Sequence, residues 1–362
     1  MKVGIVGLPN VGKSTLFNVL TKAGAASENY PFCTIEPNIG VVPVPDPRLD
    51  AISAIVKPQS IIPTSMNFVD IAGLVAGASK GEGLGNQFLA NIREATAIAQ
   101  VVRCYEDDNI VHVAGKVDPV ADCNTIETEL MLADLVTVEK AIDKNTRIAK
   151  SGNKPAMQML AICQKLQDEL QSGKMLRLLD LSEDELAVAN EMRLLTVKPM
   201  LYIANVADSS DSNDQHFIAL ENYVKVQPET NLVAICASIE SELAELTGDE
   251  LSEFLSELNM SEPGLNRVIR AGYDLLSLGT FFTAGEKEVR AWTYKHGFNA
   301  AQAAGVIHSD FEKHFIRAEV VSYPDFIKHQ GESGAKQAGV WRLEGKDYLV
   351  LDGDVIFFRT SA

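Results

Sequence analysis

The stretch GIVGLPNVGKSTLFNVLT, residues 4–21, decides the fold of this chain. A short run of branched apolar residues opens it, and a run typical of a helix closes it. Between them lies the pattern G-x-x-x-x-G-K-S, at Gly7, Gly12, Lys13 and Ser14. Strand, glycine-rich loop and helix in this order form the setting in which the pattern binds nucleotide phosphates. The sequence therefore predicts a P-loop at the start of an α/β domain.

The residues of this loop have chemistry that suits a triphosphate. Their backbone N–H groups are expected to point at phosphate oxygens, and the start of the helix adds its dipole. Lys13 is expected to neutralise β- and γ-phosphate oxygens, which makes it a catalytic as well as a binding residue. The predicted phosphate-binding residues are Asn10, Val11, Gly12, Lys13, Ser14 and Thr15.

A second motif, DIAG at residues 70–73, closes the next apolar strand. Asp70 can hold a water bound to Mg²⁺, and the Gly73 N–H can reach the γ-phosphate, so Gly73 counts among the catalytic residues. Four glycines follow between residues 74 and 88. So many glycines beside a γ-phosphate contact predict a loop that orders and disorders with hydrolysis, although a plain connector is the alternative.

Oxygen-bearing side chains from three segments make up the predicted Mg²⁺ site. Thr34 lies in YPFCTIEP (30–37), after the P-loop helix, where a switch threonine completes the coordination of the metal. An ordinary loop threonine is the alternative. Hydroxyl and carboxylate oxygens are ligands that suit Mg²⁺. The predicted metal ligands are Ser14, Thr34 and Asp70.

The stretch YIANVAD, residues 202–208, is similar to the N-K-x-D loop with which GTPases read guanine. Asn205 and Asp208 are in place, but Val206 stands where the lysine belongs. A carboxylate accepts hydrogen bonds from guanine N1 and N2, whereas adenine N1 is itself an acceptor. The predicted base-binding residues are Asn205, Val206, Asp208 and Ser238, and both purines are candidates on these residues alone.

Composition excludes several classes of protein. The formal charge of −17 argues against a generic nucleic-acid binder, although residues 199–277 alone contribute −11 of it. The five cysteines include no C-x-x-C pair, which predicts reduced thiols in a cytoplasmic protein. Met1 leads directly into an apolar strand, so no signal peptide is expected, and no apolar run is long enough to predict a membrane span.

Three kinds of sequence pattern occur along the chain. Short apolar runs rich in branched residues predict a buried, mostly parallel sheet. They lie at 2–7, 67–73, 98–106, 199–205 and 231–237. Before the fourth run, long stretches with an apolar seam predict an antiparallel pair of helices. Beyond about residue 278, alternating apolar residues and glycine turns predict a small β-rich domain with one short helix near 299–305.

Together these features resemble one family. GLPNVGKST (7–15), DIAGLVAGASKGEGLGNQFL (70–89), the helical insert, the N-V-x-acid loop and the β-rich tail are similar to those of the YchF family of Obg-like P-loop ATPases. The resemblance covers essentially the whole chain. It implies an α/β nucleotide-binding domain at 1–124 and 199–277, an antiparallel coiled-coil insert at 125–198 and a TGS domain of β-grasp type at 278–362.

The resemblance also implies an activity. Members of the family associate with ribosomes and generally prefer ATP to GTP. The family usually has Glu where this chain has Asp208, the residue that reads guanine. The missing lysine and the whole-chain resemblance favour ATP, and GTP is kept as the alternative.

Three further residues follow from the resemblance. Leu74 stands where Ras-like enzymes place the glutamine that orients water, so intrinsic turnover is expected to be slow. His112, which follows the apolar run at 98–106, is predicted to orient the water instead; a packed or surface histidine is the alternative. Asn10 is similar to an asparagine that binds K⁺ in some relatives, with an ordinary turn residue as the alternative.

Two surfaces are predicted to contact RNA of the ribosome and its 50S subunit. In the insert, cations recur at helical spacing and form a basic stripe, interrupted by Asp143, at Lys140, Lys144, Arg147, Lys150 and Lys154. In the tail, basic and aromatic residues alternate at Lys287, Arg290, Trp292, Tyr294 and Lys295. A solvated face with ion pairs and a β-core are the respective alternatives.

The sequence thus predicts a cytoplasmic, Mg²⁺-dependent ATPase that turns over slowly and binds the ribosome through its insert and tail. A GTPase switch with the same partners is the first alternative. A ribosome-bound scaffold that uses its nucleotide structurally is the second.

Overall fold

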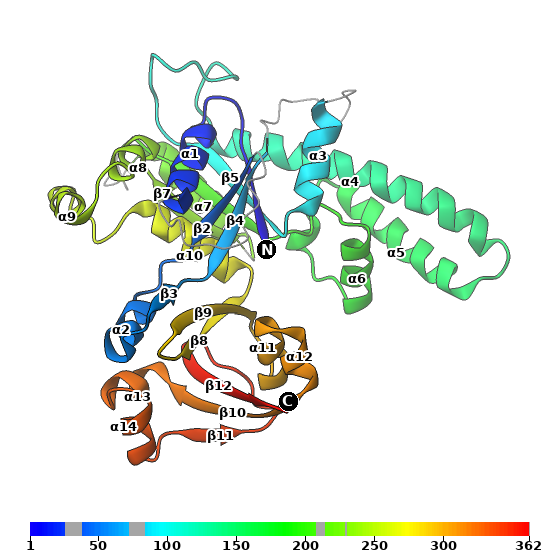
Figure 1. Ribbon diagram of the computed structural model, residues 1–362. Helices are drawn as coiled ribbons and strands as arrows, with labels where there is room; N and C mark the ends of the chain where they lie inside the picture. The colour runs from blue at the N-terminus through cyan, green and yellow to red at the C-terminus, as the bar shows by residue number, and fades with distance from the viewer. Residues whose placement is uncertain (26–37, 72–83, 208–213, 229, 362) are drawn as a thin grey trace. The chain divides into compact units, whose positions relative to one another are not determined.

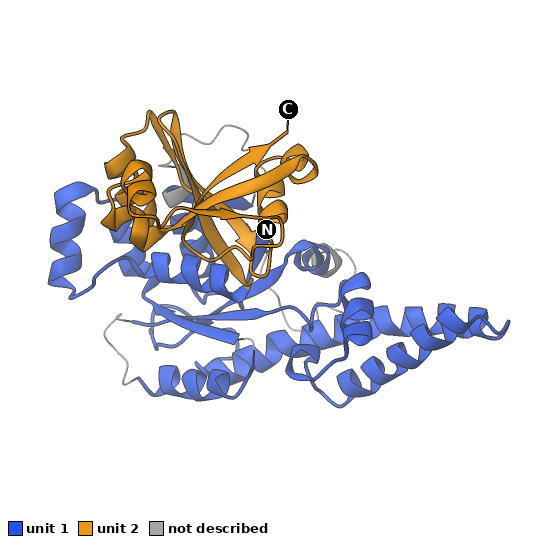
Figure 2. Ribbon diagram, turned by 90° about the horizontal axis from the view of Figure 1, so that it is seen from below, with its two compact units in different colours: residues 1–23, 34–40, 67–275 blue, residues 24–33, 41–66, 276–362 orange. Residues whose placement is uncertain are grey.

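The computed structural model describes residues 1–25, 38–71, 84–207, 214–228 and 230–361. The chain separates into two compact units, drawn in blue and orange in Figure 2. Unit 1 comprises residues 1–23, 34–40 and 67–275, and unit 2 comprises residues 24–33, 41–66 and 276–362.

A six-stranded sheet organises unit 1 (Figure 1), in the order β2-β4-β1-β5-β6-β7. Its strands are β1 (Lys2–Val6), β2 (Ile39–Pro43), β4 (Ser65–Asp70), β5 (Ala97–Arg103), β6 (Met200–Asn205) and β7 (Thr230–Ile235). β1 pairs in parallel with β4 and β5, and β5, β6 and β7 continue in parallel. Every residue of β5 and of β6 is buried, as in strands covered on both faces. The predicted parallel sheet is confirmed.

The register of the strands brings the predicted motifs to one edge of this sheet. Ile5 of β1 lies opposite Asp70 of β4, and Arg103 of β5 lies opposite Asn205 of β6. All four residues lie at or next to the carboxyl ends of their strands. In open α/β sheets this is the edge at which ligands bind.

Among the described residues, three helices of unit 1 outside the insert connect strands of its sheet, and three more follow β7. They are α1 (Lys13–Ala25), α3 (Leu84–Glu94), α7 (Gln215–Lys225), α8 (Ala237–Leu243), α9 (Gly248–Glu257) and α10 (Gly264–Leu275). α1 begins directly at the lysine of the P-loop motif, so the first turn of this helix is part of the phosphate loop.

The insert is built on two long antiparallel helices, α4 (Pro119–Ala149) and α5 (Lys154–Gln171), as Figure 1 shows. A short 3₁₀ helix (Leu176–Leu178) and α6 (Glu183–Glu191) complete it. The predicted seam is buried at Cys163, Leu166 and Leu170 and partly buried at Met159. α4 begins earlier than the sequence indicated, because Asp118 caps it and Pro119 occupies its first turn. Within the described residues, neither α4 nor any other helix has the length and apolarity to cross a membrane.

Unit 2 contains a mixed six-stranded sheet in the order β11-β10-β12-β8-β9-β3. Its strands are β3 (Ser60–Ile62), β8 (Leu278–Ala284), β9 (Glu288–Lys295), β10 (Phe315–Ser322), β11 (Arg342–Glu344) and β12 (Asp354–Thr360). Its helices are α2 (Pro47–Val56), α11 (Ala300–Ile307), α12 (Ser309–Lys313), α13 (Tyr323–Lys328) and α14 (Glu332–Gln337). β8 begins at the residue where the sequence predicts the tail to begin, and α11 lies near the predicted short helix.

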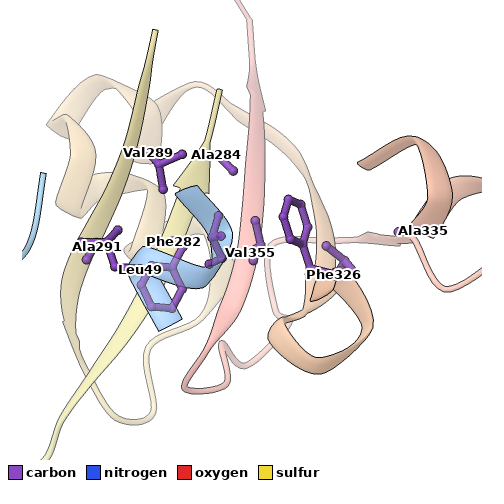
Figure 3. Packing of buried hydrophobic residues seen from close by; sticks show 10 residues of the cluster. Leu49, Phe282, Ala284, Val289, Ala291, Phe326, Ala335 and Val355 are labelled. Carbon is purple, nitrogen blue, oxygen red and sulfur yellow. The ribbon is translucent and has the colours of Figure 1, made fainter. Parts of the chain in front are cut away.

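Residues 41–66, from within β2 to the start of β4, are grouped with unit 2, whereas the predicted boundaries place them in the nucleotide-binding domain. Leu49 of α2 packs against the core that includes Phe282 and Val355 (Figure 3), and β3 extends the sheet by pairing with β9. A contact between segments more than 200 residues apart leaves no local pattern in the sequence, so the predicted boundaries did not include it.

Candidate nucleotide-binding site

The P-loop turns through two residues in the left-handed region of the backbone, Asn10 (φ 64°) and Gly12 (φ 93°). A Cβ at Gly12 would lie 2.3 Å from Nδ2 of Asn205, so only glycine lets the loop approach the end of β6. A Cβ at Gly7 would lie 2.9 Å from the carbonyl oxygen of Val101 on β5. Both motif glycines are therefore required by close packing of the loop against neighbouring strands.

Lys13 and Asp70 meet at the carboxyl edge of the sheet. The Lys13 ammonium donates to Oδ1 of Asp70, and Lys13 is buried. The pair joins the first turn of α1 to the end of β4. Ser14 and Thr15, which follow on α1, are exposed. The structure thus brings the predicted phosphate-binding lysine and the predicted metal carboxylate together, beside two exposed hydroxyl groups.

This donor set suits Mg²⁺ held mainly by a nucleotide. Ser14 offers a hydroxyl and Asp70 a carboxylate, and both are hard oxygen ligands. Among the residues that the structure describes, no three His, Cys, Asp or Glu side chains gather closely enough to hold a metal by themselves. Mg²⁺ is commonly held by one or two protein ligands together with phosphates, so the residues present fit that ion.

Four residues of the sequence analysis fall outside the described ranges. They are Thr34, Gly73, Leu74 and Asp208, and residues 75–83 of the predicted glycine-rich loop lie outside these ranges as well. The roles assigned to them, as metal ligand, γ-phosphate contact, hydrophobic substitute and base reader, stay predictions.

Asn205 ties the base-binding segment to the phosphate loop. Its Nδ2 donates to the carbonyl oxygen of Val11 at 3.0 Å, and its Oδ1 accepts from the N–H of Ala237 at 3.0 Å. The residue is 3% exposed. A primary amide has two N–H donors, so one Nδ2 hydrogen is left for a base. The sequence predicted base reading, and the structure adds a bridging role that the motif alone did not reveal.

The two predicted base-binding segments lie side by side. Cys236 donates from Sγ to the carbonyl oxygen of Ala207 at 3.1 Å and lies 3.1 Å from the hydroxyl oxygen of Ser238. Val206 is buried, whereas Ser238 is exposed. The sequence predicts only a reduced thiol at Cys236, and the structure shows that this thiol links the segments that follow β6 and β7.

His112 is buried against the first turns of α4. Its Nε2 lies 2.9 Å from Oδ2 of Asp122, and its Nδ1 accepts from the N–H of Ala114 at 3.2 Å. Nδ1 therefore carries no proton, and Nε2–H donates to Asp122. Burial raises the pKa of the Asp122 carboxyl, and the hydrogen bond from His112 opposes that shift. In this conformation neither ring nitrogen is available to a water, so a catalytic role requires His112 to move and stays a prediction.

Arg103 organises the loop that carries His112, although it belongs to no sequence motif. This side chain is 1% exposed at the end of β5. It donates to the carbonyl oxygens of Tyr105 at 3.0 Å, Ile110 at 2.9 Å and Asp107 at 3.3 Å. The available signal was an arginine at the end of a strand whose other residues are mostly apolar.

Asn10 of the P-loop also contacts this loop. Its Nδ2 donates to the carbonyl oxygen of Val111 at 3.1 Å. The residue is exposed, and its Oδ1 accepts no hydrogen bond from the described part of the chain. A carboxamide oxygen is a suitable ligand for K⁺, so the geometry is compatible with the predicted site without testing it.

The basic stripe of the insert is exposed. All five cations are accessible, at Lys140, Lys144, Arg147, Lys150 and Lys154. No ion pair joins any of them to an acidic side chain in the described ranges, whereas Lys165 and Lys174 pair with Glu185 and Glu169. This face is therefore exposed to solvent without the local ion pairs of the alternative in the described ranges, and its contact with RNA stays a prediction.

The predicted tail surface is partly core. Tyr294 is 1% exposed. Trp292 is half-buried, and the guanidinium carbon of Arg290 lies 3.9 Å from the centre of its ring. Lys287 and Lys295 are exposed. The β-core alternative, which concerned Trp292, applies to it in part and to Tyr294 in full, because both side chains pack on one hydrophobic cluster of unit 2 while Val289 and Ala291 pack on another.

Asn205 ties the phosphate loop to a base-binding segment, and Lys13 faces the Asp70 carboxylate at the end of β4. This arrangement defines a P-loop nucleotide-binding protein. Residues 2–140 match a family profile described as "50S ribosome-binding GTPase". Residues 278–361 match the YchF-GTPase_C profile, described as a protein of unknown function.

Relatives extend the match to the whole chain. Proteins named "Ribosome-binding ATPase YchF" from Pasteurella multocida and Bacillus subtilis are 60% and 52% identical to it. Each alignment covers 99% of this chain, with 98% and 99% of the relatives. The solved structure of the Schizosaccharomyces pombe YchF GTPase matches with a TM-score of 0.88 at 37% identity, over 99% of this chain and 97% of that one. The chain belongs to the YchF family.

Proposed function

We propose that this chain is a cytoplasmic ATPase that binds the ribosome and hydrolyses ATP slowly with Mg²⁺. The observation that carries the proposal is the meeting of Lys13 and Asp70 beside a P-loop at the carboxyl edge of the sheet. Relatives named as ribosome-binding ATPases, identical at 52–60% of positions over nearly the whole chain, support it.

The proposed reaction is attack of water on the γ-phosphate. The amides of the P-loop and the Lys13 ammonium bind the β- and γ-phosphate oxygens and stabilise the charge that spreads over the transferring group. To reach the phosphates, Lys13 must leave Asp70, and this frees the carboxylate to hold a metal-bound water.

The predicted metal ligands would hold Mg²⁺ at the same place. Ser14, Thr34 and Asp70 would contribute oxygen ligands or hold bound waters, and the Gly73 N–H would contact the γ-phosphate. When bound, Mg²⁺ neutralises the charge on the phosphates. Loss of the Ser14 hydroxyl is expected to raise the Mg²⁺ concentration needed for half-maximal hydrolysis.

Slow turnover follows from the position of Leu74, because leucine cannot orient a water by hydrogen bonding. His112 is proposed to supply that hydrogen bond after leaving its buried position. K⁺ held by Oδ1 of Asn10 is proposed to add positive charge beside the phosphates. A rate that rises on replacing Na⁺ by K⁺, and that does so less in Asn10→Ala, is the expected result.

ATP is proposed as the substrate, with GTP as the alternative that Asp208 favours. The test is displacement of a fluorescent nucleotide by ATP and separately by GTP, in Mg²⁺ and K⁺. Preference for ATP by about tenfold or more, about 1.4 kcal/mol, supports the ATPase. Tighter binding of GTP would show that Asp208 reads guanine and would favour the GTPase alternative.

The ribosome is proposed to be contacted through RNA, by the basic stripe of the insert and by the tail. The stripe carries five exposed cations without acidic partners in the described ranges. The tail offers Lys287 and Arg359 beside a groove of about 550 Å³ that Trp292 and Phe311 also line. Cations beside aromatic rings suit an RNA backbone and an unpaired base.

A further inference from the structure

In the histidine loop, residues 104–115, the stretch 110–113 exposes three apolar side chains and buries the polar one among them. Val111 is 75% exposed, Val113 is 54% exposed and Ile110 is 37% exposed, whereas His112 between them is 6% exposed. Aliphatic side chains are usually the ones withdrawn from water. The usual order of burial is therefore inverted over residues 110–113. The hydrophobic effect would favour a second conformation that covers the valines and releases the histidine.

The first half of the loop is fixed firmly. The buried Arg103 donates three hydrogen bonds to the carbonyl oxygens of Tyr105, Asp107 and Ile110. These bonds satisfy polar backbone groups that would otherwise lack partners, so breaking them is costly. This half of the loop is expected to stay in place while the rest moves.

The second half is held by fewer contacts with the rest of the chain. In the described ranges, Asn10 donates to the carbonyl oxygen of Val111 at 3.1 Å, and His112 donates to Asp122 at 2.9 Å. The first contact is exposed, and the second lies between two buried side chains. Hydrogen bonds to a charged acceptor are the stronger kind, so the contact with Asp122 dominates.

We propose that Asp122 is a positioning residue that holds His112 in a resting conformation and so limits the basal rate of hydrolysis. The inference rests on the catalytic role proposed for His112. The nucleotide site acquires the imidazole only when the contact with Asp122 breaks and the second half of the histidine loop leaves α4. A partner that covers Val111 and Val113 would favour that release, because it would remove exposed apolar surface from water.

The test compares the unchanged protein with Asp122→Asn, His112→Ala and the double variant. Asp118→Asn is the matched control, because Asp118 also lies at the start of α4 but contacts the Ala121 N–H and not His112. Loss of a charged hydrogen bond shifts a two-state equilibrium by about tenfold. Asp122→Asn is therefore expected to raise the basal kcat for ATP by up to about tenfold with an unchanged KM.

The other variants test whether Asp122 acts through His112. His112→Ala is expected to lower kcat, the double variant to match His112→Ala, and Asp118→Asn to match the unchanged protein. Release of the histidine is measured separately, as the rate at which diethyl pyrocarbonate modifies His112, followed by mass spectrometry. Asp122→Asn is expected to accelerate that modification, whereas a merely structural Asp122 would not protect His112 selectively.

The outcomes distinguish failure of the role proposed for Asp122 from failure of the catalytic role proposed for His112. An unchanged or lower kcat in Asp122→Asn, with His112→Ala impaired, overturns the resting role of Asp122. Unchanged modification of His112 in Asp122→Asn overturns it too. An unimpaired His112→Ala instead contradicts the proposed catalytic role of His112, and it does so whatever the modification rates show. Circular dichroism melting of each variant establishes that the compared proteins are folded.

Discussion

At the scale of single residues, Lys13 contacts the Asp70 carboxylate in this structure and is proposed to contact phosphate oxygens when a nucleotide is bound. Lys13→Ala is expected to weaken ATP binding by about 10- to 100-fold, because a hydrogen bond to a charged group contributes about 1.5–3 kcal/mol. Displacement of a fluorescent ATP analogue measures the change.

Lys22→Ala is the matched control for that prediction. Lys22 lies on the same helix, α1, but its ammonium pairs with Glu245 and is exposed. This variant is expected to bind ATP as the unchanged protein does. Equal affinities for Lys13→Ala and Lys22→Ala would contradict the assignment of Lys13.

Asn205 is predicted to matter for stability as well as for the base. Asn205→Ala removes the bridge between Val11 and Ala237 and leaves a buried N–H and carbonyl oxygen without a partner. The free energy of unfolding is expected to fall by about 1–3 kcal/mol, measured by urea denaturation. Asn18→Ala, on the exposed face of α1, should change it little. Similar losses for both variants would argue against the bridge.

The sequence predicted residues whose role depends on spacing along the chain. Gly7, Gly12 and Lys13 are required by a motif in which each residue is near the next, so their roles could be inferred locally. The burial of His112 and the clamp formed by Arg103 depend on α4 and on the loop packing around them. These contacts join segments that only the tertiary structure brings together, so the sequence alone could not predict them.

At the scale of secondary-structure elements, Asp134 of α4 closes the root of the insert. It accepts from the N–H groups of Leu195 and Thr196 at 2.9 and 2.8 Å and from the Thr196 hydroxyl at 2.7 Å. Asp134 is fully buried. Asp134→Ala leaves these donors unpaired, so the helices of the insert are expected to exchange their amide hydrogens faster, with a loss of about 3 kcal/mol or more.

Asp143→Ala provides the comparison for the insert. Asp143 lies further along α4 and is exposed. Its substitution is expected to leave amide exchange in α4 and α5 unchanged. If exchange accelerates in neither variant, the insert is held by its apolar seam and the contact at its root contributes little.

Glu319 makes the stability of unit 2 depend on pH. It accepts hydrogen bonds from Nε of Arg359 at 2.9 Å and from the indole N–H of Trp341 at 3.3 Å. The hydrogen bond from Arg359 lowers the pKa of the Glu319 carboxyl. A carboxyl with a lowered folded-state pKa stabilises the fold above its unfolded pKa of about 4.3, and this contribution is lost as pH falls through the folded value.

The expected result is a loss of unit 2 stability below about pH 4. Urea unfolding followed by tryptophan fluorescence in a Trp292→Phe background, where Trp341 is the remaining tryptophan, measures it. Glu319→Gln should be less stable at pH 7 and should show a shallower fall toward low pH. An identical pH profile for Glu319→Gln would show that other carboxyl groups dominate.

Elements were predictable where each segment shows its own period. The apolar strands and the seam of α5 were found in this way, and the structure buries them. The assignment of α2 and β3 to unit 2 was not predictable, because their partners, β8 and β9, lie more than 200 residues away. Three residues of β3 are too few to show a pattern.

At the scale of the whole molecule, charge is separated along the chain. Residues 226–266 contain nine acidic residues and no lysine or arginine, whereas residues 144–167 contain five cations and no acid. A polyanion such as RNA is repelled by the first segment and attracted by the second. Contact through the insert is therefore compatible with a chain whose net charge is −17.

Removing the cations of the stripe is expected to lower the affinity for the ribosome and to make that affinity less sensitive to salt. The variant replaces Lys144, Arg147, Lys150 and Lys154 with alanine. Each lost phosphate contact should reduce the slope of log K against log salt by about 0.7–0.9. Co-sedimentation at several KCl concentrations measures affinity and slope. The control replaces Lys165 and Lys174, which have acidic partners. An unchanged slope in the stripe variant would exclude RNA contact there.

The nucleotide state is expected to change ribosome affinity, because the insert connects β5 and β6 of the sheet that carries the phosphate loop, within one compact unit. β6, which follows the insert, ends at Asn205, and Asn205 contacts the P-loop. A ligand shifts affinity only by as much as it distinguishes two conformations, and a coupling of about 1–3 kcal/mol is typical. Ribosome affinity measured without nucleotide, with ADP and with a non-hydrolysable ATP analogue should therefore differ by about fivefold or more. Equal affinities in all three states would favour the scaffold that uses its nucleotide structurally, because an ATPase cycle without a change in affinity transmits nothing to its partner.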